Sequence, residues 1–407
     1  MTERPPTSRL QAPRILFVST YPPTRCGIAN YTHSLVEAIA QRRGSAAELG
    51  VVRLLTPGEI PVPDPMVEAY AGISNPRWVD HVARVARSYD VLWLQHEFGI
   101  YGEVGDRALR RLVEKVTTPI VTTLHTVLRR PDPLQRELTR LLVKRSAHTV
   151  VISQAARRML AESYRVDPTA IEVVPHGVHH LPKPARHPGD RPTVLTWGLL
   201  GPGKGIEWGI EALSHLKSLD PPPRYVVAGA THPQVLRTQG DAYRLGLEQL
   251  ARDLDVTDLL QMEDTYLSDD DLGRLLGSAD IAFLPYDSTD QVSSGVLVEA
   301  LGAGLPVVAT AFPHAVEMLE GGAGIVVPHR DPRAMAEAIS KLLTDPEALD
   351  AARRRAEAVG ETLHWPVIAE RCEAIAASAR RSSLIRTGPA DRRRGEYLAP
   401  GRELGRP

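Results

Sequence analysis

Residues 192–213, PTVLTWGLLGPGKGIEWGIEAL, show in one stretch how this chain is organised. An apolar, β-branched run comes first, a turn with four glycines follows, and apolar residues then recur at helical spacing. A strand that leads into a helix through such a turn is the repeating unit of doubly wound α/β folds. The turn also exposes backbone N–H groups at a helix N-terminus, which attract phosphate, and Lys204 lies beside them.

The same alternation of apolar runs and helix-like segments extends in both directions from this stretch. The runs begin at residues 14, 51, 91, 119, 148 and 171 in the first half, and at 192, 224, 258, 280, 306 and 324 in the second. Runs that are apolar on both faces belong in parallel sheets covered by helices on each side. Twelve strands suit two sheets better than one. The sequence therefore predicts an α/β protein with two doubly wound, Rossmann-like domains facing across a cleft, where ligands bind.

The length of 407 residues agrees with two or three domains. A proline-rich, charged segment, residues 179–192, suits a linker between them. The predicted organisation is a disordered N-terminus (1–13), a first domain (14–185), a second domain (186–363), a helix packing back toward the first domain (364–381) and a disordered basic tail (382–407).

Composition excludes several classes of protein. The 48 Lys and Arg nearly cancel the 49 Asp and Glu, so no global field favours nucleic acid as a partner. The two cysteines, Cys26 and Cys372, support neither a disulfide framework nor a zinc site, and a reducing cytoplasm fits them. The sequence has no signal-peptide pattern and no run of ~20 apolar residues that could span a membrane. A peripheral membrane contact of the basic tail stays open.

Two further segments place helix N-termini where a phosphate could bind. Gly27 follows the first strand in a tight turn, either as part of a binding loop or simply as a helix start. In SSGVLVEALGAGLPVVAT, residues 293–310, a serine can cap a helix that begins at Gly295 and Val296, with Glu299 near its start. Glu299 could accept ribose hydroxyls or only complement the helix dipole.

The glycine-rich turn also has the spacing of a P-loop from Gly198 to Lys204. That motif needs Ser or Thr next, to hold magnesium, and this chain has Gly205. An NTPase is therefore the least favoured function for this turn.

Taken in order, these segments resemble the retaining glycosyltransferases of family 4, which have the GT-B fold. The similarity covers residues 14–375 and includes TLHT, VISQ, VVPHGVH, the Lys-Gly turn, ADIAFLP and ALGAGLPVVAT. The resemblance implies a nucleotide-sugar donor held mainly by the second domain, a hydroxyl acceptor entering from the first, and no metal cofactor.

The resemblance also assigns roles by position. Lys204 matches the lysine at the donor diphosphate, and Glu299 matches the second glutamate of the E-x7-E motif, which holds the ribose. His125 matches a histidine near the donor sugar, and Gly27 matches the loop over the reaction centre. The loop and helix start at the diphosphate and donor sugar fall on Ser294, Gly295 and Val296.

Two positions depart from the family pattern, and both lose a charge. Gln291 stands where the first glutamate of E-x7-E is expected, near the donor sugar, and can still hydrogen-bond hydroxyls there. Leu199 stands where the family has a phosphate-binding arginine. Arg25 is one conjectured replacement for that cation.

The motif HEFGIYG brings His96, Glu97 and Tyr101 to the end of a first-domain strand. It lacks the second histidine of a zinc motif. As loop residues beside the cleft, these three could bind acceptor hydroxyls, or the segment could be a capped turn. His176 in VVPHGVH is expected to shape the connection between the domains.

The hypothesis is a cytoplasmic enzyme that transfers a hexosyl group, mannosyl or glucosyl, from a nucleoside-diphosphate sugar to a glycan, lipid-linked or small-molecule hydroxyl with retention of configuration. His125, Lys204 and Gln291 are its candidate catalytic residues. Two alternatives stay open: a sugar phosphorylase or epimerase on the same fold, and a binding or scaffold protein with a degenerate site, which Gln291 and Leu199 motivate.

Overall fold

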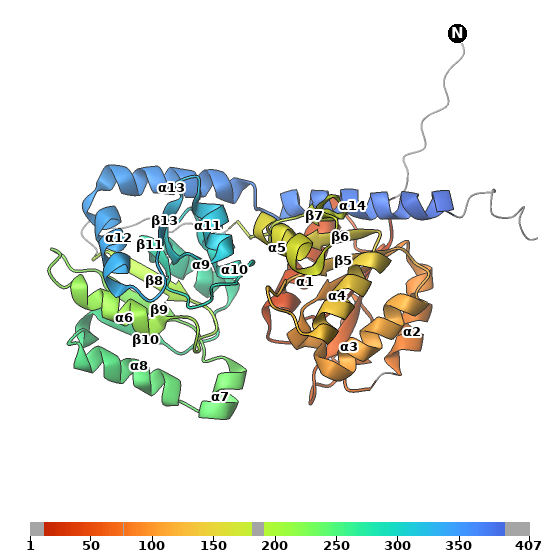
Figure 1. Ribbon diagram of the computed structural model, residues 1–407, viewed down its shortest axis with the longest axis horizontal. Helices are drawn as coiled ribbons and strands as arrows, with labels where there is room; N and C mark the ends of the chain where they lie inside the picture. Colours follow the sequence, from red (N-terminus) through yellow and green to blue (C-terminus); the bar gives the residue numbers. More distant parts are fainter. Residues whose placement is uncertain (1–11, 76, 181–190, 387–407) are drawn as a thin grey trace, which may run out of the picture.

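A computed structural model describes residues 12–75, 77–180 and 191–386 of the chain (Figure 1). The predictions of a disordered N-terminus before residue 12, of a disordered tail beyond residue 386 and of the linker at 181–190 lie outside the described residues. Within them, two parallel sheets form two lobes, as the alternation of strands and helices predicts. The α/β fold class is therefore confirmed.

The first sheet has seven strands in the order β3-β2-β1-β4-β5-β6-β7, and every neighbouring pair is parallel. Its strands are β1 (Ile15–Ser19), β2 (Leu49–Leu55), β3 (Val67–Gly72), β4 (Val91–His96), β5 (Ile120–Leu124), β6 (His148–Val151) and β7 (Ile171–Val173). Its helices are α1 (Gly27–Arg43), α2 (Trp78–Val85), α3 (Phe98–Lys115), α4 (Pro133–Arg145) and α5 (Gln154–Tyr164).

The second sheet has six parallel strands in the order β10-β9-β8-β11-β12-β13. Its strands are β8 (Thr193–Trp197), β9 (Arg224–Ala228), β10 (Leu260–Glu263), β11 (Ile281–Leu284), β12 (Val307–Thr310) and β13 (Gly324–Val327). Its helices are α6 (Ile206–His215), α7 (Pro233–Gln239), α8 (Ala242–Asp253), α9 (Asp269–Ser278), α10 (Gly295–Gly302), α11 (Pro313–Leu319), α12 (Pro332–Thr344) and α13 (Pro346–Glu361).

Burial on both faces explains why the strands read as continuous apolar runs. Along β1, Leu16 and Val18 pack into one apolar cluster of the first domain, and Ile15 and Phe17 pack into the cluster on the opposite face. The second sheet likewise has one cluster on each face. Parallel strands carry side chains on alternate sides, so each sheet needs helices on both faces.

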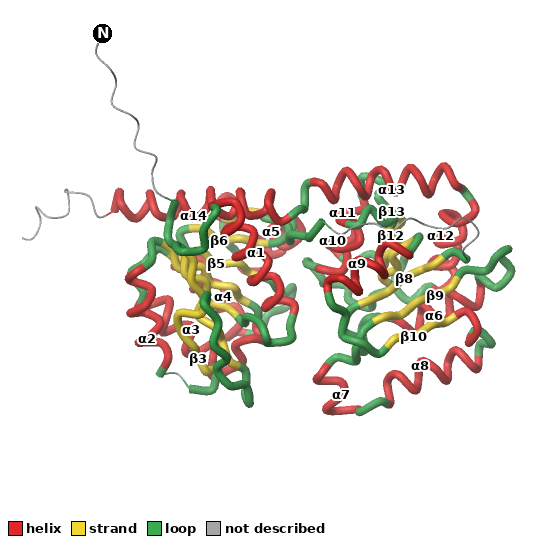
Figure 2. The backbone as a smooth tube through the Cα atoms, turned by 180° about the vertical axis from the view of Figure 1, so that it is seen from behind, coloured by secondary structure: helices red, strands yellow, loops and turns green. Residues whose placement is uncertain are grey.

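The last helix, α14 (Trp365–Arg386), crosses back to the first domain, and Figures 1 and 2 show it lying along that lobe. Trp365, Ile368 and Cys372 are buried there against β1, β4 and α1. The helix ends at Arg386 rather than at the predicted residue 381.

Two other elements differ from the expectation. The edge strand β3 is absent from the predicted set, because its sequence, VEAYAG, contains a glutamate and a glycine and lacks a continuous β-branched run. The residues expected as a loop after β4 are helical from Phe98, with a break at Gly102, whose φ is +63°.

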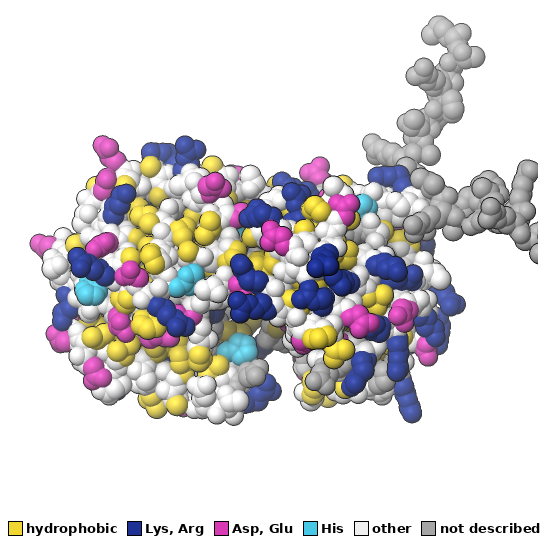
Figure 3. All heavy atoms as spheres, viewed as in Figure 1, with side chains coloured by type: hydrophobic (Ala, Val, Ile, Leu, Met, Phe, Trp, Pro, Cys, Tyr) yellow, Lys and Arg dark blue, Asp and Glu magenta, His cyan; other side chains and the backbone are white. Residues whose placement is uncertain are grey.

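The near-zero net charge hides an uneven distribution. Residues 12–180 contain 21 Lys and Arg against 16 Asp and Glu, whereas residues 191–363 contain 14 against 26. Figure 3 shows Lys and Arg side chains gathered over the first lobe, and a hollow between the two lobes. No helix of the described residues is long and apolar enough to cross a membrane.

Candidate active site

The N-terminus of α10 carries two backbone donors that no described residue satisfies. Ser294 caps the helix, and its Oγ accepts a hydrogen bond from the Leu297 N–H at 3.2 Å. The N–H groups of Gly295 and Val296 have no acceptor among the described residues. Such donors, at the positive end of the helix dipole, form a site for an anion.

The glycine-rich turn after β8 lies against this helix end. A Cβ at Gly198, whose φ is +103°, would lie 3.5 Å from the Val296 side chain. Lys204 lies beyond the turn, with its Nζ 3.3 Å from the Tyr286 hydroxyl oxygen and 4.3 Å from the centroid of that ring. The ring face attracts the ammonium group and so restricts its position.

Glu299 lies one turn further along α10 and has a fixed orientation. Its Oε2 accepts a hydrogen bond from the Trp197 indole Nε1–H at 2.8 Å, and Trp197 is buried at the end of β8. The carboxylate and the glycine-rich turn therefore belong to the same corner of the second domain. The roles of Glu299 at a ribose and of Lys204 at a diphosphate stay predictions.

His125 directly follows β5 and is almost fully buried. Its Nε2 lies 2.7 Å from Gln95 Oε1, and its ring packs edge-on against Tyr31 of α1 with the centroids 4.7 Å apart. Burial, with smaller effects of His176 and His96, lowers the pKa of His125 to about 3. The neutral ring donates from Nε2 to the amide oxygen, which leaves Nδ1 as a hydrogen-bond acceptor.

The loop before α10 docks directly on the first domain. The Ser293 hydroxyl donates to the His125 carbonyl oxygen at 2.9 Å, and Ser153 donates to the Val292 carbonyl oxygen at 2.6 Å. The Val292 side chain is buried in an apolar cluster of the first domain. Arg129 forms an ion pair with Asp290 at 2.9 Å. These contacts bring His125 next to the free end of α10.

Gln291 lies in this docked loop. The side-chain Nε2 of Gln291 donates to the Ser293 carbonyl oxygen at 3.0 Å. The backbone carbonyl oxygen of Gln291 accepts a hydrogen bond from the His314 backbone N–H at 3.2 Å. The amide thus holds the loop in the shape that presents Ser294 and α10. An ionised carboxylate at this position would have no proton to donate to the Ser293 carbonyl oxygen, so the amide is required for this hydrogen bond.

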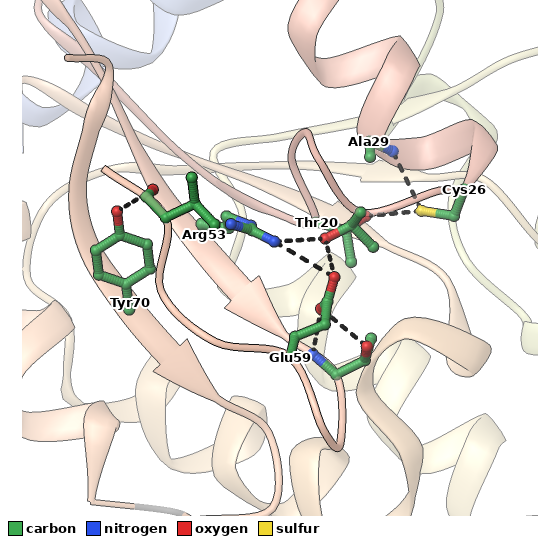
Figure 4. Close-up of polar contacts among 9 residues, drawn as sticks. Thr20, Cys26, Ala29, Arg53, Glu59 and Tyr70 are labelled. Carbon is green, nitrogen blue, oxygen red and sulfur yellow. Dashed lines mark hydrogen bonds and ion pairs between the residues drawn. The ribbon is translucent and has the colours of Figure 1, made fainter. Parts of the chain in front are cut away.

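Gly27, expected in the loop over the reaction centre, lies at the start of α1. Gly27 is the first helical residue, Cys26 is the N-cap, and Cys26 Sγ accepts from the Ala29 N–H at 3.4 Å. Figure 4 shows the Arg53 guanidinium directed at this loop, where it donates to Thr24, and at the Glu59 carboxylate. The loop before Gly27 is therefore anchored to β2.

Arg25, in the same loop, reaches across to the second domain. Its guanidinium carbon lies 5.4 Å from the ring centroid of Tyr266, between β10 and α9. This contact links the two domains. It provides no support for the conjecture that Arg25 replaces a phosphate cation expected at position 199, since Tyr266 belongs to neither the glycine-rich turn nor α10.

Of the three residues expected to bind the acceptor, two are buried and one is partly exposed. His96 is the last residue of β4 and is fully buried, and Tyr101 is buried with its hydroxyl donating to the Gln95 carbonyl oxygen at 3.2 Å. Neither is a cleft-lining loop residue, because both pack in the core between β4 and α3. Glu97 is partly exposed and caps α3 by accepting the Gly99 N–H at 2.6 Å, as a capped turn requires.

The sequence motifs do not predict that two histidines contact the start of α10. Nδ1 of His314, in α11, accepts the Ser294 N–H at 2.9 Å. Nε2 of His176 lies 3.7 Å from the position of a Cβ on Gly295. His176 comes from the segment after β7 and His314 from the helix that follows β12, so spacing within one motif reveals neither contact.

Comparisons with known proteins show the family to which this chain is similar. The family model described as Glycosyl transferases group 1 matches residues 179–359, and the model described as Glycosyltransferase Family 4 matches residues 26–180. The chain is 27% identical over 319 residues to a D-inositol 3-phosphate glycosyltransferase of Kineococcus radiotolerans, covering 70% of each chain.

A second relative is aligned over more of the chain. It is a GDP-mannose-dependent alpha-(1-6)-phosphatidylinositol monomannoside mannosyltransferase of Mycolicibacterium smegmatis, 25% identical over 390 residues, with 86% of this chain and 93% of the relative covered. Among solved structures, Anabaena Alr3699/HepE in complex with UDP superposes with a TM-score of 0.69 at 17% identity, covering 90% of this chain and 100% of that one. The chain is thus a member of the group 1, family 4 glycosyltransferases, with the GT-B fold.

Proposed function

We propose that this glycosyltransferase transfers a hexosyl group from a nucleoside-diphosphate sugar to a hydroxyl acceptor with retention at the anomeric carbon. The observation that carries the proposal is the pair of unsatisfied N–H groups on Gly295 and Val296, beside the turn that precedes Lys204. Phosphate oxygens satisfy such donors well. Glu299, oriented by its hydrogen bond from Trp197, is the proposed contact of the ribose.

In the proposed reaction, the bond between the anomeric carbon and the diphosphate oxygen breaks while the acceptor oxygen bonds to the same face of that carbon. The acceptor proton passes to the departing diphosphate. Negative charge grows on that diphosphate as the sugar becomes oxocarbenium-like. Lys204 and the two N–H groups stabilise the growing charge, which lowers the barrier because they are already in position.

The docked loop gives the first domain a part in this reaction. Ser293 holds the His125 backbone beside α10, so a sugar on the diphosphate would meet His125 from the first domain. The neutral imidazole can accept a hydrogen bond from a sugar hydroxyl at Nδ1. Closure of the two domains would exclude water, which otherwise competes with the acceptor.

The test is a thermal-shift panel of UDP-, GDP- and ADP-sugars, followed by turnover with a hydroxyl acceptor. The printed names of relatives and neighbours include GDP-mannose and UDP, so the panel spans both bases. A donor at about 100 times its dissociation constant should stabilise the fold by ~2.7 kcal/mol. Proton NMR of the product then assigns the anomeric configuration. A product of inverted configuration would contradict the proposal.

A binding protein with a degenerate site is the second candidate, favoured by Gln291 and Leu199. Its signature is a nucleotide sugar that binds but yields no product with any acceptor. Turnover without an acceptor, or turnover that requires inorganic phosphate, would instead identify an epimerase or a phosphorylase on this fold.

A further inference from the structure

His176 aims an imidazole at the end of α10 where the proposed diphosphate binds. It lies on the segment after β7, is partly buried, and its Nε2 is 3.7 Å from the Cβ position of Gly295. Among the described residues, Nε2 has no hydrogen-bond partner. The ring is held edge-on against Tyr31, with the centroids 5.0 Å apart, and tilted against Trp365 at 5.7 Å.

The other ring nitrogen decides what Nε2 can do. Nδ1 lies 2.7 Å from the Gly177 carbonyl oxygen, which can only accept a hydrogen bond, so Nδ1 carries a proton. In the neutral ring, Nε2 is then a bare lone pair. A lone pair repels a phosphate oxygen, whereas a second proton makes Nε2 a charged donor. An anion can therefore use His176 only as an imidazolium.

The surroundings of His176 favour its neutral form. Burial and, to a smaller extent, His179 lower the pKa of His176 to about 4, although the hydrogen bond to Gly177 acts in the opposite direction. The titratable groups facing it from other elements are His125 after β5, His314 of α11 and Tyr31 of α1. Where the family has a carboxylate in the neighbouring loop, this chain has the neutral Gln291.

We propose that donor binding protonates His176, and that its imidazolium supplies the phosphate cation that is absent at Leu199. This inference rests on the proposed donor site at α10. Near a protein surface, one negative charge about 4 Å away favours protonation by roughly a thousandfold, and a donor diphosphate brings more than one. The anion therefore offsets the cost of charging a partly buried ring.

The experiment is calorimetry of UDP-glucose and GDP-mannose binding in buffers of different ionisation enthalpy, which counts the protons taken up. Neither donor's diphosphate titrates between about pH 5 and 8. With the wild-type protein, we expect uptake of about half a proton or more at pH 6.5, and affinity that rises toward tenfold per pH unit as the pH falls.

His176→Gln keeps a neutral polar group of similar reach and should bind the donor more weakly, with no proton uptake and no pH dependence. His180→Asn is the matched control on the same segment, since its exposed ring packs on His364 rather than on α10. It should behave as the wild type. Thermal unfolding of each variant checks its fold.

Two results overturn the inference while the proposed function stands. One is donor binding without proton uptake, and the other is uptake that persists in His176→Gln. If neither donor binds the wild-type protein at any pH, while other nucleotide sugars also fail, the proposed donor site itself is wrong and this inference falls with it.

Discussion

Lys204 is the side chain on which the proposed donor site depends most for charge. Lys204→Ala should lower kcat/KM by roughly 30- to 1000-fold, equivalent to ~2 to 4 kcal/mol of transition-state stabilisation. The measurement is steady-state kinetics with the donor found in the panel. Lys217→Ala is the control. Lys217 also belongs to the second domain, but it is exposed, follows the C-terminal end of α6 and pairs with Asp255. Equal activity of the two variants would remove Lys204 from the mechanism.

Asp106 makes a second prediction at the residue scale. Burial, then Glu97 and Asp132, raises the pKa of Asp106 to about 6, and its Oδ1 is buried without a partner among the described residues. The folded state therefore prefers the protonated form. The protonated Asp106 contributes fully to the free energy of unfolding below the pKa of the unfolded chain, near 3.8. This contribution is lost as the pH rises through 6.

Asp106→Asn should consequently raise the free energy of unfolding at pH 7.5 by about 1 to 2 kcal/mol, a value discounted for its partial exposure. At pH 4, the variant and the wild type should be equally stable. Urea unfolding at both pH values measures the difference. A stabilisation of the same size at pH 4 would show that charge is not the cause.

Among elements, the junction of α5 and α11 is one of the contacts that hold the two domains together. Glu317 of α11 accepts the N–H groups of Gln154 and Ala155 at 2.9 and 2.7 Å, and so caps α5 in the other domain. Glu317→Ala should cost about 1 to 2 kcal/mol and widen the distribution of domain orientations in small-angle scattering. Glu320→Ala, which removes an exposed carboxylate at the end of the same helix, should change neither.

Most elements can be predicted from this sequence because their signals are local. All twelve expected strands form, and Ser294, Gly295 and Val296 make the expected helix start. The burial of His96 and Tyr101 was not predicted, because only packing between α3 and β4 decides it. The contacts of His176 and His314 with α10 depend on long-range folding, which residue spacing does not encode.

At the scale of the whole molecule, the last described helix, α14, completes the apolar core of the first domain. Trp365 is buried beside Tyr31, and its ring fills the space where a Cβ on Gly177 would lie. Trp365→Ala should destabilise the protein by ~3 to 5 kcal/mol, and Trp365→Phe should cost less, because it leaves a smaller cavity. Thermal unfolding compares the two, and an unchanged midpoint for the Ala variant would contradict this role of α14.

The central claim is that the N–H groups at the start of α10 bind the donor diphosphate. Proline suits the first position of a helix and follows an extended residue, which Ser294 is, so Gly295→Pro removes one donor and keeps the helix. Gly295→Ala is the matched control: it retains the N–H, and its Cβ would be in ordinary contact with His176 at 3.7 Å.

The decisive measurement is therefore the affinity of the nucleotide sugar for these two variants, determined by calorimetry. Gly295→Ala should bind the donor as the wild type does. Gly295→Pro should bind it roughly ten- to a hundredfold more weakly, because a hydrogen bond to a charged group is lost. Equal affinity of the two variants would contradict the placement of the diphosphate at α10.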